Sequence, residues 1–246
     1  MAGGYVINDI MDLEVDKINE RRNNAVMIFG RKRSIILYIV LNILGLFYGF
    51  WLSYNLEIIQ LWSVHLISIL SLWLYSIFFK TMPIAGNLII AAFCGLIPII
   101  SLLFEFGSLK IQLTPPYFIF SFLALFAFLI TLIREMIKDM QDIEGDRQTG
   151  MYTLPILFGI NASKGVTTLI NLLLIALTLT WIYFFMGKDW MSVTYMIVGI
   201  FSPILFLNYK LIYARNSSDY HNISIKLKGI MMVGLLYPII YYSQHL

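Results

Sequence analysis

The sequence predicts an all-α fold: a multi-pass transmembrane helical bundle with seven full spans and an N-terminal helix stub. Of its 246 residues, 59% are hydrophobic and 13% are charged, and the mean hydropathy is +0.80. A soluble domain of this length could not bury so much apolar surface. The apolar residues also form long runs without the alternation of β-strands.

The first element expected is the helix stub. The apolar stretch at the start of the chain is too short to span a bilayer and has no basic flank before it, so a signal peptide is not indicated. Residues 1–19 are therefore expected to form the inner end of a helix. We expect residues 1–246 to form one membrane-embedded domain.

Seven apolar runs follow the stub, and each approaches or exceeds the roughly 20 residues that a membrane helix needs. They lie near residues 34–54, 60–79, 84–104, 117–138, 166–186, 190–209 and 227–243. Pro98, Pro203 and Pro238 fall within runs, and membrane helices tolerate proline where neighbouring groups satisfy the freed carbonyl.

Basic residues are strongly biased to one side of these runs. If the runs alternate in direction, 15 of the 17 Lys and Arg residues share one side, and Lys110 and Lys188 lie on the other. The positive-inside rule places the basic side in the cytoplasm, so a cell-membrane protein is expected. Four tryptophans fall at the opposite ends of their runs, where an interfacial belt is expected: Trp51, Trp62, Trp181 and Trp190.

Two acidic clusters share the same spacing, and both fall on the predicted cytoplasmic side. They are Asp9, Asp12 and Asp16 in the first cluster, and Asp139, Asp142 and Asp146 in the second. Residues three, four or seven positions apart share a helix face, so each cluster predicts a carboxylate face. Asn8 extends the first ladder by one turn, and Gly145 is expected to end or loosen the second helix.

Such crowded carboxylates repel one another unless cations lie between them. Magnesium prefers hard oxygen ligands and is usually held by a few carboxylates plus substrate phosphates. No His or Cys cluster points to zinc. A single acidic run at a helix end is most often a solvated face, but the same spacing twice on one side favours a functional site. Six nearby basic residues could bind phosphate: Arg21, Arg22, Lys80, Arg134, Lys138 and Arg147.

The segments "NDIMDLEVD" and "KDMQDIEGD" resemble the paired aspartate motifs of the UbiA family of intramembrane prenyltransferases. "DIEGDRQTGMYTLPILFG" and "YSIFFKTMPIAGN" are similar to the continuation of its second motif and to the stretch after its fourth helix. The family has nine transmembrane helices, and its first motif closes the second. The resemblance therefore implies that this chain lacks the first helix and most of the second, an N-terminal truncation that puts its activity in question.

The resemblance implies transfer of a prenyl group from a prenyl diphosphate to a lipophilic acceptor in the bilayer, with two Mg²⁺ ions and no nucleic-acid partner. The implied metal ligands are Asn8, Asp9, Asp12, Asp16, Asp139, Asp142 and Asp146. The implied catalytic residues are Lys80, Lys138, Arg147, Tyr75 and Tyr5. The implied diphosphate-binding residues are Arg21, Arg22, Lys80, Arg134, Lys138, Arg147 and Asn87.

The acceptor stays open at this point. The motif sequences look nearest to the branch that uses geranylgeranylglyceryl phosphate. Aromatic acceptors, such as quinone precursors or porphyrins, are the alternative. A divalent-cation transporter and a non-catalytic remnant are two further hypotheses. The stretch "NERRNNAVMIFGRKRS" departs from the Arg-Pro-rich turn common in the family, so the sequence does not decide whether Arg21 or Arg22 takes the arginine's role.

Overall fold

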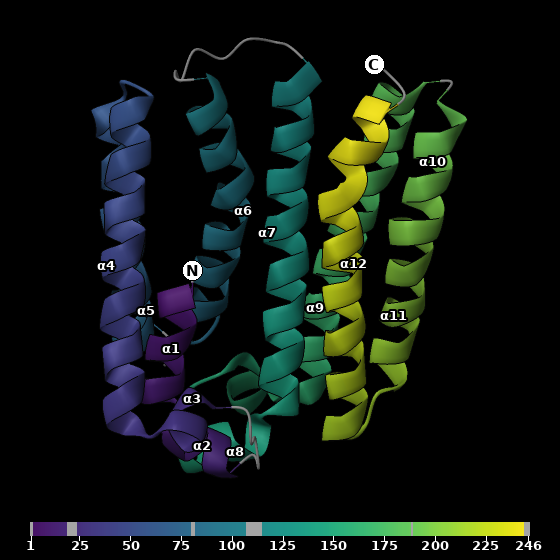
Figure 1. The fold of residues 1–246 in the computed structure, drawn as a ribbon. Helices are drawn as coiled ribbons and strands as arrows, with labels where there is room; N and C mark the ends of the chain where they lie inside the picture. Colours follow the sequence, from purple (N-terminus) through teal and green to yellow (C-terminus); the bar gives the residue numbers. More distant parts are fainter. Residues whose placement is uncertain (1, 19–23, 80–81, 107–114, 188, 244–246) are drawn as a thin grey trace. The chain divides into compact units, whose positions relative to one another are not determined.

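The computed structural model describes residues 2–18, 24–79, 82–106, 115–187 and 189–243, and every element in these ranges is helical (Figure 1). The chain divides into two compact units. Unit 1 comprises Met1–Gly86, Leu103–Leu109 and Glu144–Thr153, and unit 2 comprises Asn87–Leu102, Lys110–Ile143 and Leu154–Leu246. The expected all-α class is confirmed.

The elements run in chain order as follows. They are α1 (Ala2–Met11), α2 (Leu13–Ile18), α3 (Ala25–Phe29), α4 (Arg31–Asn55), the 3₁₀ turn η1 (Ile59–Leu61), α5 (Trp62–Ile77), α6 (Ala85–Phe106), α7 (Pro115–Gln141), α8 (Ile143–Gln148), α9 (Leu154–Trp181), the π-helical turn η3 (Ile182–Met186), α10 (Trp190–Met196), the π-helical turn η4 (Ile197–Phe201), α11 (Ser202–Tyr213) and α12 (Ser217–Ser243).

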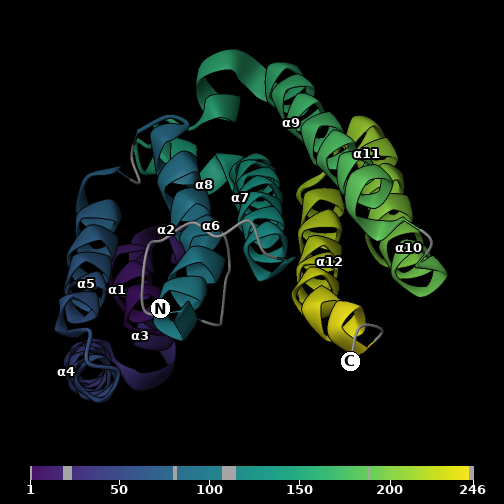
Figure 2. The same ribbon diagram turned by 90° about the horizontal axis from the view of Figure 1, so that it is seen from above.

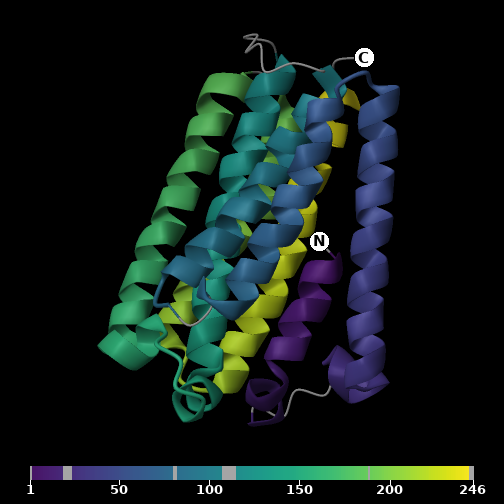
Figure 3. The same ribbon diagram turned by 90° about the vertical axis from the view of Figure 1, so that its left-hand side faces the viewer.

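In unit 1, the short α1 packs against the long helix α4 and against α5 (Figure 3). Two adjacent glycines allow the close approach. A Cβ atom at Gly3 would meet the Asn42 Oδ1 atom at 2.8 Å, and one at Gly4 would meet the Leu72 Cδ1 atom at 2.9 Å. The stub predicted for residues 1–19 is therefore helical where the structure describes it, and it is held by packing.

In unit 2, α7 packs against α9 and α12, and α11 packs against both α9 and α12 (Figure 2). The core lies among these helices and includes the fully buried Ile133, Leu174, Ile204, Leu211 and Leu227. A smaller apolar cluster joins Ala91 of α6 to α7 and to the start of α9. The described end of α7 that carries the second motif is thus anchored on several helices.

Within the described residues, six helices are long and apolar enough to cross a membrane, so the prediction of seven full spans is wrong by one. The run predicted at 60–79 forms η1 and then the 16-residue α5. At about 1.5 Å per residue, this helix falls short of a hydrocarbon core of about 30 Å. Pro83 disfavours a helical conformation in the residue before it, which fits a helix ending ahead of that proline.

Two helices begin well before the apolar runs that predicted them. α9 starts at Leu154 instead of near 166, and α12 starts at Ser217 instead of near 227. The first turns of α12 are polar, and in α9 the polar residues Asn161, Ser163 and Lys164 separate its apolar first turns from the run predicted at 166–186, so neither helix start falls within a predicted run. α9 also contains Gly159 at φ +84°, a backbone conformation that glycine adopts readily, and the chain kinks there.

The prediction that Trp181 belongs to an interfacial belt is wrong. Trp181 is 6% exposed, and its ring stacks on Phe122 at 4.6 Å and on Phe185 at 4.2 Å between centroids. Its indole N–H donates to the Tyr237 hydroxyl at 3.0 Å. Because a buried partner satisfies the polar atom, this tryptophan belongs to the core of unit 2.

Candidate functional site

The first aspartate motif forms a helix, a bend and a second short helix. α1 ends at Met11, the chain bends at Asp12, and α2 begins at Leu13. The hydrogen bonding continues through the bend, because the Asp12 N–H donates to the Asn8 carbonyl and the Asp16 N–H donates to the Asp12 carbonyl, both at 2.8 Å. Asn8, Asp12 and Asp16 therefore keep the four-residue spacing that predicted a common face.

The carboxylates of this motif are held by amides. The Asn8 side-chain amide donates to Asp12 Oδ2 at 2.6 Å. Asp12 is 7% exposed and Asp16 is 6% exposed, so both carboxylates lie in a protected environment. Burial of an ionised carboxylate is costly unless hydrogen bonds or cations stabilise it.

Asn24 belongs to the first motif's site and was not among the predicted site residues. It is 2% exposed, and its Nδ2 atom donates to Asp16 Oδ2 at 2.8 Å and to the Asp9 carbonyl at 2.7 Å. Its Oδ1 atom accepts from the Val26 N–H at 2.8 Å and caps α3. One side chain thus ties the motif to the following helix. An Asn directly before an apolar helix is a capping signal, but nothing in the sequence links it to Asp16.

The second motif repeats the same local fold. α7 ends at Gln141, the chain bends at Asp142, and α8 runs from Ile143 to Gln148. Gly145 was predicted to end or loosen the helix, but it lies inside α8, and the break comes earlier, at Asp142. The chain turns after α8 at Gly150, which adopts φ +72°. Glycine in this left-handed conformation is common just after the end of a helix.

The last turns of α7 carry an ionic cluster. Arg134 Nη1 lies 2.6 Å from Glu135 Oε1, and Lys138 Nζ lies 3.1 Å from Glu135 Oε2. Glu135 was not among the predicted site residues. These two of the six predicted phosphate-binding cations therefore share one carboxylate, and a bound phosphate would compete with that carboxylate for them.

The first aspartate of each motif is held in a similar way. Asp9 Oδ2 accepts from the Ala25 N–H at 2.8 Å, and Asp139 Oδ2 accepts from the Asn87 side-chain amide at 2.7 Å. Asn87 was predicted to bind the diphosphate, and the structure brings its amide to the second motif. Each of these two aspartates is thus fixed by a donor from a distant part of the sequence.

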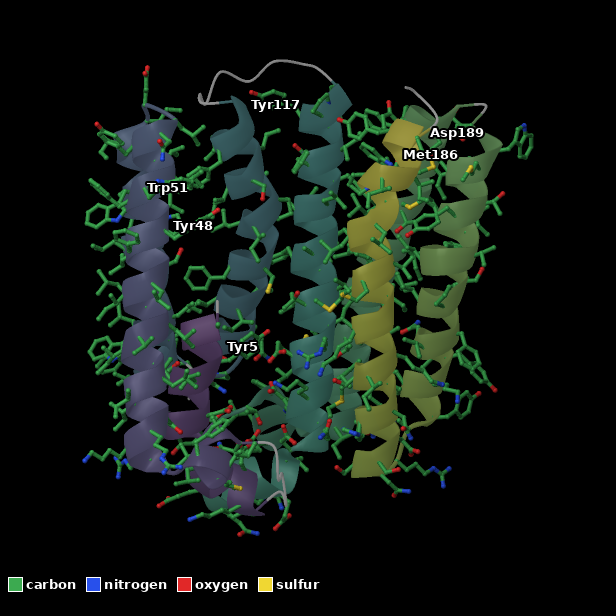
Figure 4. The ribbon with its side chains drawn as sticks, viewed as in Figure 1. Tyr5, Tyr48, Trp51, Tyr117, Met186 and Asp189 are labelled. Atoms are coloured by element: carbon green, nitrogen blue, oxygen red, sulfur yellow. The ribbon has the colours of Figure 1, made fainter. Side chains whose placement is uncertain are left out.

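The remaining predicted residues are placed as follows. Tyr5 lies on α1 and is 75% exposed (Figure 4). Tyr75 lies on α5 and is buried. Asp146 is 6% exposed on α8, and Arg147 beside it is exposed. The predictions for Arg21, Arg22 and Lys80 fall outside the described residues.

The donor atoms of both motifs fit magnesium. Asp carboxylates and an Asn amide supply hard oxygen ligands, which Mg²⁺ prefers. Across the described residues, no three His, Cys, Asp or Glu side chains gather closely enough to hold one metal ion. Mg²⁺ usually keeps several waters and needs one or two carboxylates plus substrate phosphates, so a smaller protein ligand set is sufficient.

The two repeated motifs and the helical membrane fold agree with a family model. Residues 1–227 match the model of the UbiA prenyltransferase family. The chain belongs to this family. The resemblance seen in the motifs is therefore confirmed, and the protein is a prenyltransferase embedded in a membrane by multiple helices.

Curated relatives and a solved structure extend the match along the chain. The digeranylgeranylglyceryl phosphate synthase of Methanosphaera stadtmanae is 31% identical over 240 residues, covering 96% of this chain and 81% of the relative. The enzyme of the same name from Sulfurisphaera tokodaii is 32% identical over 215 residues, covering 84% and 69%. A solved structure described as a digeranylgeranylglyceryl phosphate synthase in membranes has a TM-score of 0.62 and 25% identity, covering 96% and 79%.

Proposed function

We propose that this chain transfers a geranylgeranyl group from its diphosphate to geranylgeranylglyceryl phosphate. Two relatives that carry the corresponding name match most of the chain at 31% and 32% identity, and this observation carries the choice of acceptor. In this proposal the two motifs bind only the donor's diphosphate, so they do not select the acceptor. An aromatic acceptor is therefore the second candidate.

The diphosphate site is assigned to the two aspartate motifs. Magnesium, when bound, neutralises the diphosphate and makes it a better leaving group. The magnesium ligands from the first motif would be Asn8, Asp12 and Asp16. Those from the second motif would be Asp142 and Asp146. Asp9 and Asp139 each accept a protein N–H on one oxygen, so they would ligate through the other oxygen or through water.

One structural observation supports a role for both motifs in one reaction. The segment Glu144–Thr153, which carries Asp146, belongs to the same compact unit as the first motif. Within that unit, α2 and the start of α8 lie at the same end (Figures 1 and 3). Asp142 precedes Asp146 by only four residues in the sequence.

Basic residues would bind the leaving group. Arg134 and Lys138 would exchange part of their contact with Glu135 for phosphate oxygens, and Arg147 is exposed on α8. We assign Arg21, Arg22 and Lys80 to the same task on chemical grounds, together with the Asn87 amide. Positive charge next to the bridging oxygen stabilises the negative charge that grows there as the carbon–oxygen bond breaks.

The reaction breaks the C1–O bond of the donor, forms a bond from C1 to a hydroxyl oxygen of the acceptor, and releases diphosphate and the proton of that hydroxyl. Positive charge develops at the allylic C1 atom, and aromatic ring faces stabilise such a cation while apolar surroundings exclude water. Tyr5 and Tyr75 are the candidates for this role. We place both motifs on the cytoplasmic side of the membrane, in agreement with the distribution of basic residues.

The test measures transfer in membranes that contain the full chain, with labelled geranylgeranyl diphosphate, Mg²⁺ and geranylgeranylglyceryl phosphate. Asp12→Ala and Asp142→Ala should each lower the rate by on the order of 100-fold or more, because each removes a proposed metal ligand. Glu14→Ala and Glu144→Ala are matched controls. They remove exposed acids two residues after each of these aspartates and should keep normal rates.

Other outcomes would contradict the proposal in distinct ways. Normal turnover in both aspartate variants would reject the metal assignment. Product formed with 4-hydroxybenzoate, and none with the glycerolipid, would assign the chain to aromatic acceptors. Magnesium uptake into vesicles without prenyl transfer would favour the transporter hypothesis, and no product with any acceptor would favour a non-catalytic remnant.

A further inference from the structure

A groove of about 280 Å³ lies in unit 2, between the end of α11 and the first turns of α12. Its polar lining comes from Tyr209, Lys210, Tyr213, Asp219, Asn222 and Lys226. These residues lie in a different part of the sequence from both aspartate motifs, and the proposed prenyl transfer assigns them no task. The volume is just below the usual range for ligand pockets, which suits a small polar group.

The positive charge of the groove is concentrated around one aromatic ring. The Lys210 Nζ atom lies 5.0 Å from the centroid of the Phe206 ring, and the Lys226 Nζ atom lies 5.7 Å from the same centroid. The ring face attracts each ammonium group. Two positive charges near the same ring raise the local positive potential, which favours the binding of an anion.

Asp219, the acidic residue of the groove, accepts hydrogen bonds from the backbone just before α12. Asp219 Oδ2 accepts from the Arg215 N–H at 2.9 Å and from the Asn216 N–H at 3.2 Å, ahead of the first turn of α12. Its charge offsets part of the lysine charge, and the groove keeps an excess of positive charge. The exposed Asn222 amide adds a neutral donor beside the lysines.

The groove lies where two candidate membrane spans are joined. These spans are Trp190–Tyr213 and Ser217–Ser243, and the connection between α11 and α12 lies at one end of both (Figure 1). A short connection between two spans is expected at a membrane boundary. The Tyr209 and Tyr213 rings are 4.8 Å apart, and these residues are 60% and 64% exposed. Exposed tyrosines are typical of the headgroup layer. The Ser217 hydroxyl donates to the Gln141 carbonyl at 3.0 Å, so the groove shares its end of unit 2 with the end of α7.

We propose that this groove binds the phosphate of an anionic phospholipid headgroup. Lys210 and Lys226 pair with the phosphate oxygens, and Asn222 and the tyrosine hydroxyls hydrogen-bond the glycerol of the headgroup. Basic pockets between transmembrane helices commonly bind anionic headgroups in this way. The bound lipid would brace α11 against α12 and is not consumed.

Native mass spectrometry of the detergent-purified full chain tests the proposal with phosphatidylglycerol as the probe. The double variant Lys210→Gln/Lys226→Gln should bind this lipid about 30-fold more weakly, from the typical contribution of two basic residues at a membrane surface. Lys228→Gln is the matched control, because it removes an exposed charge from α12 outside the groove and should keep wild-type affinity. Circular dichroism of each variant checks that the helices are retained.

Two comparisons separate a lipid site from a site for free phosphate. Phosphatidylcholine, which carries no net charge, should bind more weakly than phosphatidylglycerol, and inorganic phosphate should fail to displace the bound lipid. Equal binding of both lipids, or full affinity in the double variant, would overturn the proposal. Displacement by inorganic phosphate would overturn the lipid assignment, because the groove would then bind the free anion.

Discussion

At the scale of single residues, the first motif depends on an amide as much as on its acids. Asn24 holds a buried Asp16 oxygen, the Asp9 carbonyl and the Val26 N–H at once. Asn8 similarly holds Asp12. Amides can fix carboxylates without neutralising them, so the carboxylates keep the negative charge that a divalent cation requires.

Asn24→Ala should therefore loosen the proposed metal site. Loss of the buried hydrogen bonds should lower the free energy of unfolding by about 1–3 kcal/mol. The magnesium concentration for half-maximal transfer should rise by about tenfold or more, because residues that orient metal ligands have effects of this size. A magnesium titration of the transfer rate measures this shift, and thermal unfolding measures stability.

Two further variants distinguish positioning from general stability. Asn24→Asp places a carboxylate beside Asp16 and should impair transfer more than the alanine variant does. Asn55→Ala removes an exposed amide that donates to the Trp51 carbonyl within α4, and it should change neither quantity. If Asn24→Ala lowers stability with an unchanged magnesium requirement, Asn24 is structural and does not position Asp16 for metal.

At the scale of elements, the two motifs have the same local structure. In each, a helix bends at the middle aspartate, and a six-residue helix carries the last aspartate. The spacing predicted the shared face correctly for Asn8, Asp12 and Asp16, because the four-residue hydrogen bonds persist through the bend. It did not predict the bend, since no proline or glycine occupies either bend position.

The packing of α1 gives a prediction about its glycines. Gly3→Leu should destabilise unit 1 by about 1–3 kcal/mol, because its side chain would have to displace Asn42 at the contact with α4. Since α1 carries Asn8 and Asp9, the variant should also raise the magnesium requirement. Thermal unfolding and the magnesium titration report the two effects.

Gly45→Leu provides the matched control within the apolar helix α4. A Cβ atom at Gly45 would have no heavy atom within 4 Å, so the added side chain enters open space. This variant should keep wild-type stability and magnesium dependence. Equal behaviour of the two leucine variants would show that α1 does not depend on close packing against α4.

At the scale of the whole molecule, composition and periodicity predict the class of fold well and its details less well. Six of the seven predicted runs contain helices of spanning length, but α5 is shorter than its apolar run. Hydropathy runs miss the polar first turns of α12 and the start of α9, which polar residues separate from its apolar run. They also do not show the burial of Trp181, which depends on Phe122 and Tyr237 from distant helices. Asn24 and Glu135 escaped prediction for the same reason, since their importance comes from their partners.

The membrane orientation gives the last prediction. Each unit can be tested by itself, because each exposes residues at both ends. In unit 1, Tyr48 and Trp51 lie toward the end of α4 opposite α2, and Glu57 follows that end (Figure 4). In unit 2, Met186 and Asp189 lie at the end opposite the connection between α11 and α12, which contains Asn216 (Figure 4).

Single cysteines placed in a Cys94→Ser background, which then has no other cysteine, should report these ends. Glu57→Cys and Trp190→Cys should react with a membrane-impermeant maleimide added to intact cells. Gln148→Cys and Asn216→Cys should react only after the membrane is opened, because the basic residues cluster on their side. Labelling of Gln148→Cys in intact cells would place the second motif outside, where a cytoplasmic supply of prenyl diphosphate and magnesium would not reach it.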